Sequence, residues 1–274
     1  MKISNIFKEH KCVVSCEIFP PKKSDGVEAV LDTAKKIAAL KPGFISVTYG
    51  AGGTGALGDI TADIAGEILG FGATPLAHMT AHENISVTTS KFAKKGIENI
   101  LVLKGDDTPS DKYAYAKDLL ADLNGKGFCL GAAAYPEGHV SQHNPFTCIN
   151  HLRQKQDAGA EFFVTQLFFD NKIFYRFRDL ALAAGITVPI SAGIMPIMSK
   201  AQVARMVFLC GASLPAPIIK LVNKYGESGD CLAKAGIDYA LSQMQDLKNN
   251  GVEGIHIYTM NKPEVAEYCM KGLC

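Results

Sequence analysis

The sequence lacks the features that mark secreted, membrane and nucleic-acid-binding proteins. No window of its 274 residues is apolar enough to span a bilayer, and residues 1–10 contain lysines without the apolar run of a signal peptide. The 28 basic and 27 acidic residues give a net charge of +1 with no long run of either sign, which argues against a nucleic acid or an anionic membrane as partner. We therefore expect a cytoplasmic protein.

Cysteine is present, but not in the patterns that hold a metal or a disulfide framework. The eight cysteines form no Cys-x-x-Cys pair, so we expect reduced, mostly buried thiols and no metal site. Cys269 and Cys274 lie at the end of the sequence, and for these two the alternative is contact with a metal or a partner protein. The eight are Cys12, Cys16, Cys129, Cys148, Cys210, Cys231, Cys269 and Cys274.

Apolar runs typical of strands recur about every 30 residues, and a pattern with helical spacing follows each run. The predicted strands are Val13–Phe19, Phe44–Tyr49, Pro75–Met79, Ile100–Leu103, Phe128–Tyr135, Phe162–Phe168, Pro189–Ile194 and Ile255–Tyr258. The predicted helices after them are Val27–Leu40, Ile60–Leu69, Val87–Lys95, Tyr113–Leu123, Pro145–Ala158, Ile173–Ala184, Gln202–Leu209 and Pro263–Lys271.

Eight such units predict a closed (β/α)8 barrel, for which about 250 residues is typical. Two further helices, Ala216–Tyr225 and Cys231–Asn249, are expected between the seventh and eighth strands. The mostly apolar strands agree with a parallel sheet covered by helices. An open doubly wound sheet is the alternative, but the even spacing favours closure. No linker interrupts the sequence, so we expect one domain over residues 1–274.

A glycine-rich stretch at residues 50–55 matches the G-x-G-x-x-G pattern of dinucleotide-binding folds. Such a fold carries an acidic residue at the end of the next strand, about 20 residues further on. Here the next strand ends in His78-Met79-Thr80. We therefore interpret the stretch as a loop at the barrel mouth that gives a ligand close access to the backbone.

Polar residues gather where the predicted strands end, which is the face of a (β/α)8 barrel that carries the chemistry. Every strand except the seventh ends in a side chain that can hydrogen-bond or titrate, and this regularity indicates a small-molecule site. In strand order the residues are Glu17; Thr48 and Tyr49; His78 and Thr80; Lys104 and Asp106; Tyr135, Glu137 and His139; Gln166; and Tyr258, Thr259 and Asn261.

Glu17 is the strongest candidate for an acid. Pro20-Pro21 ends its strand just beyond it, because proline lacks the backbone donor that a sheet needs. Its neighbours Cys16, Ile18 and Phe19 predict a poorly solvated pocket. Such a pocket favours the protonated carboxyl that a proton donor needs. The alternative is a carboxylate that points into water at the end of a strand.

Other charged pairs give weaker signals. Lys104 and Asp106 face the same way in an extended chain, so they either pair with each other or act in the site. Histidines four residues apart, at positions 78 and 82 and at 139 and 143, have metal-binding spacing only on a helix and lie at strand ends. No His-x-His follows the first strand, which makes a metal-dependent barrel hydrolase a weak alternative. We assign no role to His10, His143 and His256.

Nine short stretches between residues 12 and 262 form a further pattern. They are Glu17–Lys22, Ser46–Ala51, Ala77–Thr80, Leu103–Asp106, Ala134–His139, Lys155–Ala160, Thr165–Asp170, Gly193–Pro196 and Ile257–Asn261. Together and in this order they resemble the methylenetetrahydrofolate reductase family. Any one stretch would be a weak signal, but the ordered set is specific.

The resemblance implies a flavoenzyme with FAD at the barrel mouth that reduces 5,10-methylenetetrahydrofolate to 5-methyltetrahydrofolate by hydride transfer. Glu17 would be the general acid for the departing folate nitrogen, and Asp106 would lie near the flavin and the pterin. The implied folate contacts are Asp106, Gln166, Gln202 and Lys262. The implied FAD contacts are Thr48, Tyr49, Ala51, His78, Lys104, Gly105, Asp106, Tyr115, Ala116, Tyr135, His139, His151 and Lys155.

The sequence departs from the family pattern at several positions. Lys104 stands where arginine is frequent, which replaces a two-pronged contact by a point charge. Cys148, His151 and Gln154 stand where Asp, Asn and Arg help to hold FAD. Met206 stands where an aromatic residue stacks in some members. The changes at positions 148, 151 and 154 concern the adenosine side of FAD, and the change at position 206 concerns the nicotinamide site.

The electron donor and the assembly stay open at this point. NADH is the simplest donor and a partner subunit that delivers electrons is the alternative, so we expect a homo-oligomer or a hetero-complex. We also expect a compact bacterial form without the regulatory domain of eukaryotic members. The alternative function is a folate-binding barrel subunit that depends on a partner protein for electrons or methyl transfer.

Overall fold

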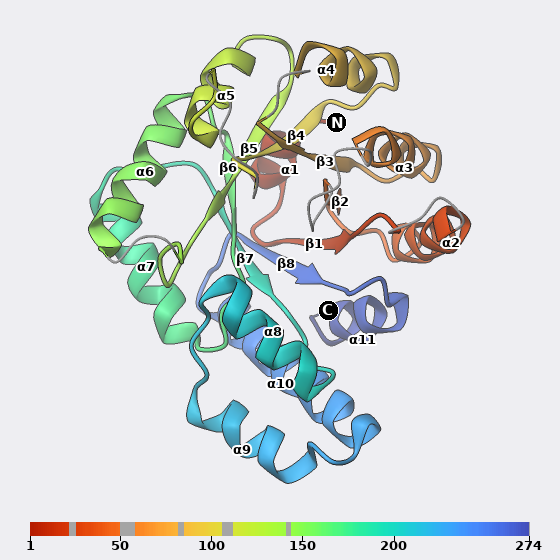
Figure 1. The fold of residues 1–274 in the computed structure, drawn as a ribbon, viewed down its shortest axis with the longest axis vertical. Helices are drawn as coiled ribbons and strands as arrows, with labels where there is room; N and C mark the ends of the chain where they lie inside the picture. The colour runs from red at the N-terminus through yellow and green to blue at the C-terminus, as the bar shows by residue number, and fades with distance from the viewer. Residues whose placement is uncertain (22–25, 50–57, 82–84, 106–111, 141–143, 274) are drawn as a thin grey trace.

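Parallel strands form a closed ring at the centre of the molecule (Figure 1). The computed structural model describes residues 1–21, 26–49, 58–81, 85–105, 112–140 and 144–273. Each strand pairs with the next, and the last pairs with the first, which confirms the (β/α)8 barrel. The strands are β1 (Val13–Ile18), β2 (Ile45–Val47), β3 (Pro75–Thr80), β4 (Asn99–Leu103), β5 (Cys129–Ala134), β6 (Phe162–Thr165), β7 (Ile190–Ile194) and β8 (Gly254–Tyr258).

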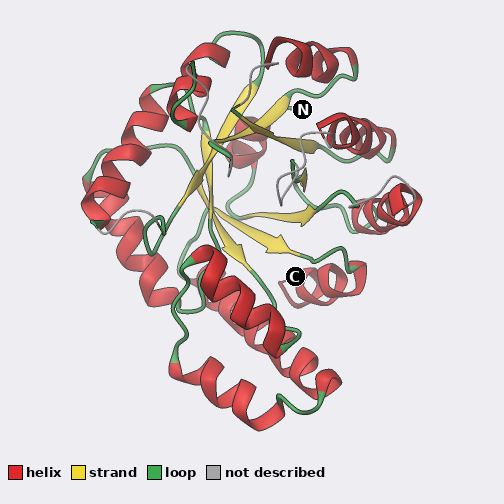
Figure 2. Ribbon diagram, viewed as in Figure 1, coloured by secondary structure: helices red, strands yellow, loops and turns green. Residues whose placement is uncertain are grey.

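Helices surround the ring, as Figure 2 shows. They are α2 (Val27–Ala38), α3 (Gly58–Gly70), α4 (Ile85–Lys94), α5 (Ala116–Leu123), α6 (Pro145–Asp157), α7 (Asn171–Ala183), α8 (Lys200–Cys210) and α11 (Pro263–Leu273). Between β7 and β8 the chain adds α9 (Ala216–Tyr225) and α10 (Gly229–Asn249), which confirms the two extra helices. Among the described residues, no helix combines the length and apolar character needed to cross a membrane.

The helical spacing read from the sequence corresponds to buried faces. In α2, Val30, Ala34 and Ile37 are buried against the outside of the barrel. Side chains with oxygen acceptors cap the N-termini of several helices. At the start of α7, for example, Asp170 accepts a hydrogen bond from Lys172 N at 3.0 Å. Local sequence and barrel packing therefore favour the same helices.

One helix was not predicted from the sequence. This helix, α1 (Ile3–Glu9), closes the N-terminal end of the barrel and lies behind the ring of strands in Figure 1. The Phe7 ring lies 6.4 Å from that of Phe44 in the barrel interior, and the Asn99 carboxamide accepts a hydrogen bond from Ile3 N at 2.8 Å. Aromatic and aliphatic side chains thus fill this end. The opposite end, at the carboxyl ends of the strands, is left for a ligand.

The apolar run after β6 was wrongly predicted as strand. β6 ends at Thr165, and the run continues as a loop whose residues 167–169 are buried beneath α10. Gln243 on α10 donates to Phe168 O (3.1 Å), and Tyr239 donates to Phe169 O (2.7 Å). Side chains of α10 therefore satisfy backbone carbonyls that a sheet would otherwise bind.

Candidate functional site

Glu17 points into the barrel and belongs to a group of polar side chains that we call the acid cluster, consisting of Ser15, Glu17, Ser46, His78 and His256. Strand register brings the members together. Ser15 is paired with His256 across β1 and β8, and Glu17 is paired with Ser46 across β1 and β2. Paired residues on neighbouring strands point to the same side of a sheet, which here is the barrel interior.

Oε2 of Glu17 is the shared contact of the acid cluster. Ser46 Oγ donates to it at 3.2 Å, and Nε2 of His78 and Nε2 of His256 each lie 3.5 Å away. The Glu17 side chain is 16% exposed, compared with 7% for His78 and 1% for His256. Glu17 therefore lies at the boundary between the barrel interior and the mouth. The alternative in which it points into open water is excluded.

Burial and hydrogen bonding act on Glu17 in opposite directions. Burial raises the pKa of Glu17, but the hydrogen bond with His256, the nearby rings of His78 and His256, and the Ser46 hydroxyl lower it by more. The resulting pKa lies below the ordinary value of 4.5. The sequence-based prediction of a preferred protonated form was therefore wrong for this arrangement.

The predicted pocket of sequence neighbours was also wrong. Cys16 and Ile18 are fully buried on the outer side of β1, where the Cys16 thiol contacts Met270 Sδ of α11 at 3.9 Å. Phe19 is 38% exposed. Because side chains alternate along a strand, the neighbours of Glu17 in space come from β2, β3 and β8.

Two buried polar atoms near the ends of β2 and β3 have no hydrogen-bond partner among the described residues: Thr48 Oγ1 and His78 Nε2. Burial lowers the pKa of His78 to about 4, so its ring is neutral near pH 7. Unpaired buried polar atoms cost free energy. A ligand that supplied hydrogen bonds to both would recover this cost.

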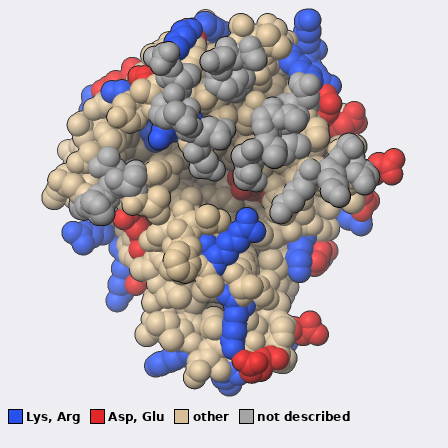
Figure 3. All heavy atoms as spheres, in the orientation of Figure 1, with Lys and Arg blue, Asp and Glu red and all other residues tan. Residues whose placement is uncertain are grey.

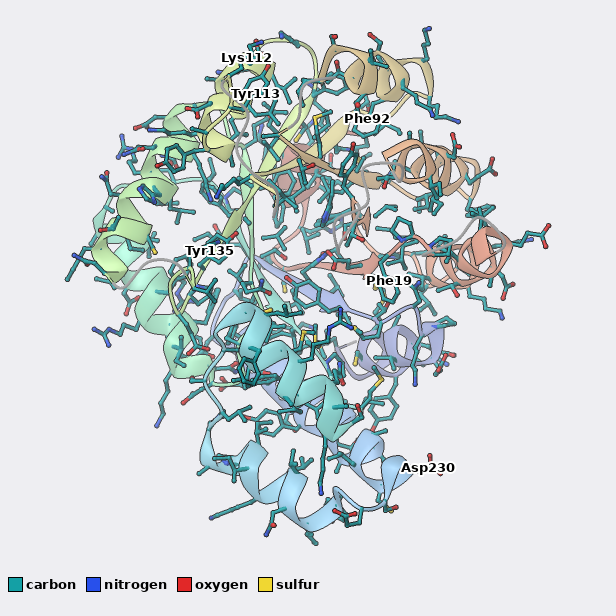
Figure 4. The ribbon with its side chains drawn as sticks, viewed as in Figure 1. Phe19, Phe92, Lys112, Tyr113, Tyr135 and Asp230 are labelled. Carbon is teal, nitrogen blue, oxygen red and sulfur yellow. The ribbon has the colours of Figure 1, made fainter. Side chains whose placement is uncertain are left out.

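A cavity of about 360 Å³ opens between β4, β5, α5 and α6, and we call it the basic cavity. Its lining includes no Asp or Glu among the described residues. Figure 4 places Tyr135, in the cavity wall, and Phe19, two residues after Glu17, on opposite sides of the barrel. Its basic residues are Lys104, Lys117, His139, His151 and Lys155.

Lys155 is the most enclosed cation of the basic cavity. Its Nζ donates to Ala133 O at 2.8 Å and lies 5.4 Å from the centre of the Tyr135 ring. Burial lowers the pKa of Lys155 to about 8, and no carboxylate among the described lining residues offsets the loss of water. An anionic ligand would provide the missing counter-charge.

Aromatic rings form flat surfaces in the same cavity. Tyr135 meets His139 edge to face, with ring centres 4.9 Å apart, and the Tyr115 ring lies 6.3 Å from that of His151. Burial, together with the nearby lysines, lowers the pKa of His151. The cavity thus combines cations with surfaces on which a planar ring can pack.

The mouth is not a surface of one charge. Figure 3 shows this face hollowed at its centre, with basic and acidic atoms spread around it. Among the described residues, no three His, Cys, Asp or Glu side chains are arranged to hold a metal ion. The described cysteines are free thiols, of which Cys16, Cys129 and Cys269 are buried and Cys231 is exposed.

The sequence matches the methylenetetrahydrofolate reductase family over residues 2–273. The chain belongs to this family. It is 30% identical over 262 residues to the 5,10-methylenetetrahydrofolate reductase of Escherichia coli, which covers 92% of this chain and 88% of that protein. It is also 30% identical over 285 residues to methylenetetrahydrofolate reductase (NADH) 1 of Arabidopsis thaliana, with 95% and 48% covered. The chain therefore spans about half the length of the plant relative.

A solved structure with a similar fold is an uncharacterized protein from Clostridium thermocellum that binds two copies of 5-methyl-5,6,7,8-tetrahydrofolic acid. The two folds superpose with a TM-score of 0.70 over 98% of this chain and 96% of the other, at 15% identity. At this identity the likeness shows the fold alone.

Some positions that the family pattern assigns to folate are occupied in hydrogen bonds with the backbone. Gln166 Oε1 accepts from Leu167 N at 2.9 Å. Gln202 Oε1 accepts from Met198 N at 2.7 Å, and its Nε2 donates to the loop between β7 and α8. Lys262 is exposed beyond β8. These bonds fix the orientation of both carboxamides.

Other predicted FAD contacts lie at the rim. Tyr49 follows β2, Lys104 and Gly105 follow β4, and Ala116 begins α5. Gly105 has φ +86°, a conformation that favours glycine, and an added Cβ would lie 3.1 Å from the Thr80 side chain.

Ala51 and Asp106 lie outside the described residues, as do the whole glycine-rich stretch, His82 and His143. Their roles, and a pair between Lys104 and Asp106, stay predictions.

Sequence reasoning missed Ser15, Ser46 and His256. The last of these was left without a role, yet it contacts both Ser15 and Ser46 inside the barrel. A signal was available, because Ser15 and Glu17, like His256 and Tyr258, are polar residues two apart in otherwise apolar strands. That spacing indicates a polar stripe on the inner side of a strand.

In the basic cavity, Lys117, which donates to Gln154 at 2.8 Å, was also missed.

Proposed function

We propose that this protein reduces 5,10-methylenetetrahydrofolate to 5-methyltetrahydrofolate with FAD bound at the barrel mouth. The observation that carries the proposal is that one barrel mouth holds a largely buried carboxyl, Glu17, on one side and, on the other, a cavity whose described lining has cations and no carboxylate. Membership of the methylenetetrahydrofolate reductase family supports the same reaction.

The residues of the basic cavity fit FAD. Lys155 and His139 would contact the pyrophosphate, since no described lining residue gives the Lys155 ammonium a carboxylate counter-charge. The rings of Tyr115 and Tyr135 provide packing surfaces for the planar parts. The buried hydroxyl of Thr48, near the mouth, has no hydrogen-bond partner in the described part of the chain and is available to a ligand. When bound, FAD would supply the hydride.

Glu17 would supply the proton. Opening the methylene bridge leaves a folate nitrogen that must be protonated, and a carboxyl at the boundary of the mouth can donate to it. The low pKa of Glu17 requires that it take up a proton once substrate is in place. A ligand that covers the mouth removes water from Glu17 and shifts the balance toward the protonated form.

The remaining assignments complete the proposed site. Asp106 would favour positive charge on the reacting folate, and Gln166, Gln202 and Lys262 would contact it. We propose NADH as the donor, in line with the name of the Arabidopsis relative. Delivery of electrons by a partner subunit is the alternative outcome of the test below.

The test begins with the visible spectrum of the purified chain, followed by NADH and then 5,10-methylenetetrahydrofolate without oxygen. We expect a yellow protein that NADH bleaches and the folate reoxidises. Glu17→Gln should bleach normally but reoxidise slowly, whereas Lys112→Met, on the surface beside Asp122, should behave as the wild type.

Other outcomes have defined meanings. A yellow protein that neither NADH nor NADPH bleaches would assign electron delivery to a partner. A colourless protein that takes up no FAD yet binds folate tightly would contradict the proposal and support the folate-binding subunit.

A further inference from the structure

Three residues link Glu17 to the barrel interior in a continuous series of short contacts. Ser46 Oγ lies 3.2 Å from Glu17 Oε2 and 3.2 Å from His256 Nε2. On the other side of the imidazole, His256 Nδ1 lies 2.7 Å from Ser15 Oγ. The proposed reaction gives a role to Glu17 alone among these four residues.

The number of hydrogens sets the direction of these bonds. A carboxylate only accepts, so Ser46 uses its single hydrogen toward Glu17 and must accept from Nε2 of His256. The hydroxyl of Ser15 is closer to Nδ1 of His256, at 2.7 Å, than to the carbonyl of Ile255, at 3.4 Å. In the tautomer that carries its hydrogen on Nε2, Nδ1 accepts from Ser15, and the donors run in one direction from Ser15 to Glu17.

Packing holds the His256 ring in the orientation that these hydrogen bonds require. It stacks on Phe44, with ring centres 5.7 Å apart and planes at 21°, and it meets Tyr258 edge to face at 5.4 Å. Tyr258 in turn donates to Thr165 O at 2.7 Å. His256 is fully buried, so no water competes for its two nitrogens.

We propose that Ser15, His256 and Ser46 form a hydrogen-bonded chain that positions the carboxyl of Glu17 for proton donation. In this assignment, which rests on the proposed function, His256 is a positioning residue and not a catalytic one. The chain holds Oε2 toward the barrel interior, and every described contact of the carboxyl involves that oxygen. Oε1 is thereby left for the folate nitrogen.

The chain also opposes protonation of Glu17 before substrate arrives, because its last donor favours the carboxylate. The other titratable groups facing Glu17 among the described residues are His78 from β3 and Tyr258 from β8. Burial lowers the pKa of His78 and raises that of Tyr258, so both are neutral near pH 7. Neither is in hydrogen-bonding geometry with Glu17, unlike Ser46.

The test measures the titration of the Glu17 carboxyl by carbon-13 NMR in protein labelled at glutamate, with Glu17→Gln used to assign the signal. The measurement is made on flavin-free protein and needs neither FAD nor folate. It therefore stays interpretable if the proposed reaction fails. Ser46→Ala should raise the titration midpoint by about one pH unit, since it removes the closest donor and leaves His256 Nε2 at 3.5 Å, while burial remains.

Ser15→Ala is the decisive variant, because Ser15 contacts His256 and has no described contact with Glu17. We expect it to raise the midpoint in the same direction by a smaller amount, and we expect Ser15→Thr, which keeps the hydroxyl, to restore it. Ser191→Ala is the matched control. It removes an interior hydroxyl of β7 that has no hydrogen-bond partner among the described residues.

An unchanged midpoint in Ser15→Ala, with a raised one in Ser46→Ala, would show that Ser46 acts alone and would overturn the chain. An equal rise in Ser191→Ala would show a general effect of interior polarity and would overturn it as well. In active protein, the chain predicts that Ser15→Ala shifts the pH profile of folate-dependent reoxidation upward without changing FAD affinity.

Discussion

The acid cluster and the basic cavity lie on opposite sides of one barrel mouth, but they are built differently. The acid cluster consists of inward-facing strand residues whose neighbours are set by register. The basic cavity takes its charged groups largely from α5, α6 and the loops after β4 and β5. One region holds a carboxylate beside hydroxyl and imidazole groups, and the other holds cations without a carboxylate in the described lining.

The difference matches the chemical demands on each region. Proton transfer requires placement to within a fraction of an ångström, which strands provide better than loops. Charge neutralisation tolerates displacement, because the Coulomb energy changes slowly with distance. Departures from the family pattern at Cys148, His151 and Gln154 fall in the second region. The acid cluster should therefore be sensitive to small changes, and the basic cavity should respond gradually.

The largest expected effect comes from Glu17→Gln. This change keeps the shape of the side chain but removes its proton, so folate-dependent reoxidation should slow by about 10²–10⁴-fold. FAD affinity should stay within about twofold, because Glu17 lies outside the basic cavity. Stopped-flow absorbance and a flavin titration measure the two quantities. A comparable loss of FAD affinity would show that the two regions are not separate.

The next effect concerns the packing around the acid cluster. A Cβ on Gly193 would collide with the carbonyl of Thr165 and lie 2.8 Å from the Tyr258 hydroxyl oxygen. Gly193→Ala should lower the free energy of unfolding by about 1–3 kcal/mol, measured by urea denaturation. The control is Gly229→Ala at the start of α10, where an added Cβ meets nothing within 4 Å. Equal stability of the two variants would contradict the close packing.

Lys155→Met should weaken FAD binding by about tenfold, or about 1.4 kcal/mol, because the anion loses its enclosed cation. In the wild type, affinity should fall as the pH rises through about 8, where Lys155 loses its proton. The variant should lack this decline. Fluorescence titration of FAD at several pH values tests both statements. A pH dependence that persists in Lys155→Met would assign it to another group.

The smallest effect is on acid stability. The pKa of His78 is about 4 in the folded protein and 6.5 ordinarily, so the unfolded chain binds more protons between these values. Stability should therefore fall as the pH drops from about 6.5 to about 4, by about 1 kcal/mol between about pH 7 and pH 5.5. His78→Gln should flatten this part of the curve. Urea midpoints at several pH values provide the measurement, and an unchanged slope would exclude His78 as the cause.

Local patterns made the barrel and many positions near its mouth predictable. Glu17, His78, Lys104 and Lys155 all follow from strand ends or family motifs. The partners of Glu17 did not follow, because Ser15 and His256 are 241 residues apart and meet only when the first and last strands pair. α1 was missed for a related reason, since its apolar residues become informative only against the end of a barrel.

The sequence by itself determined the number of strand-helix units, the faces that helices bury and the residue types at the mouth, since each depends on spacing within about 20 residues. Only the tertiary structure decided which side chains surround Glu17 and in which direction its pKa moves. Ring closure sets the register of β1 against β2 and β8, and that register brings hydroxyl and imidazole groups to the carboxyl. Burial and hydrogen bonding shift a pKa in opposite directions, so their balance follows from contacts between distant segments.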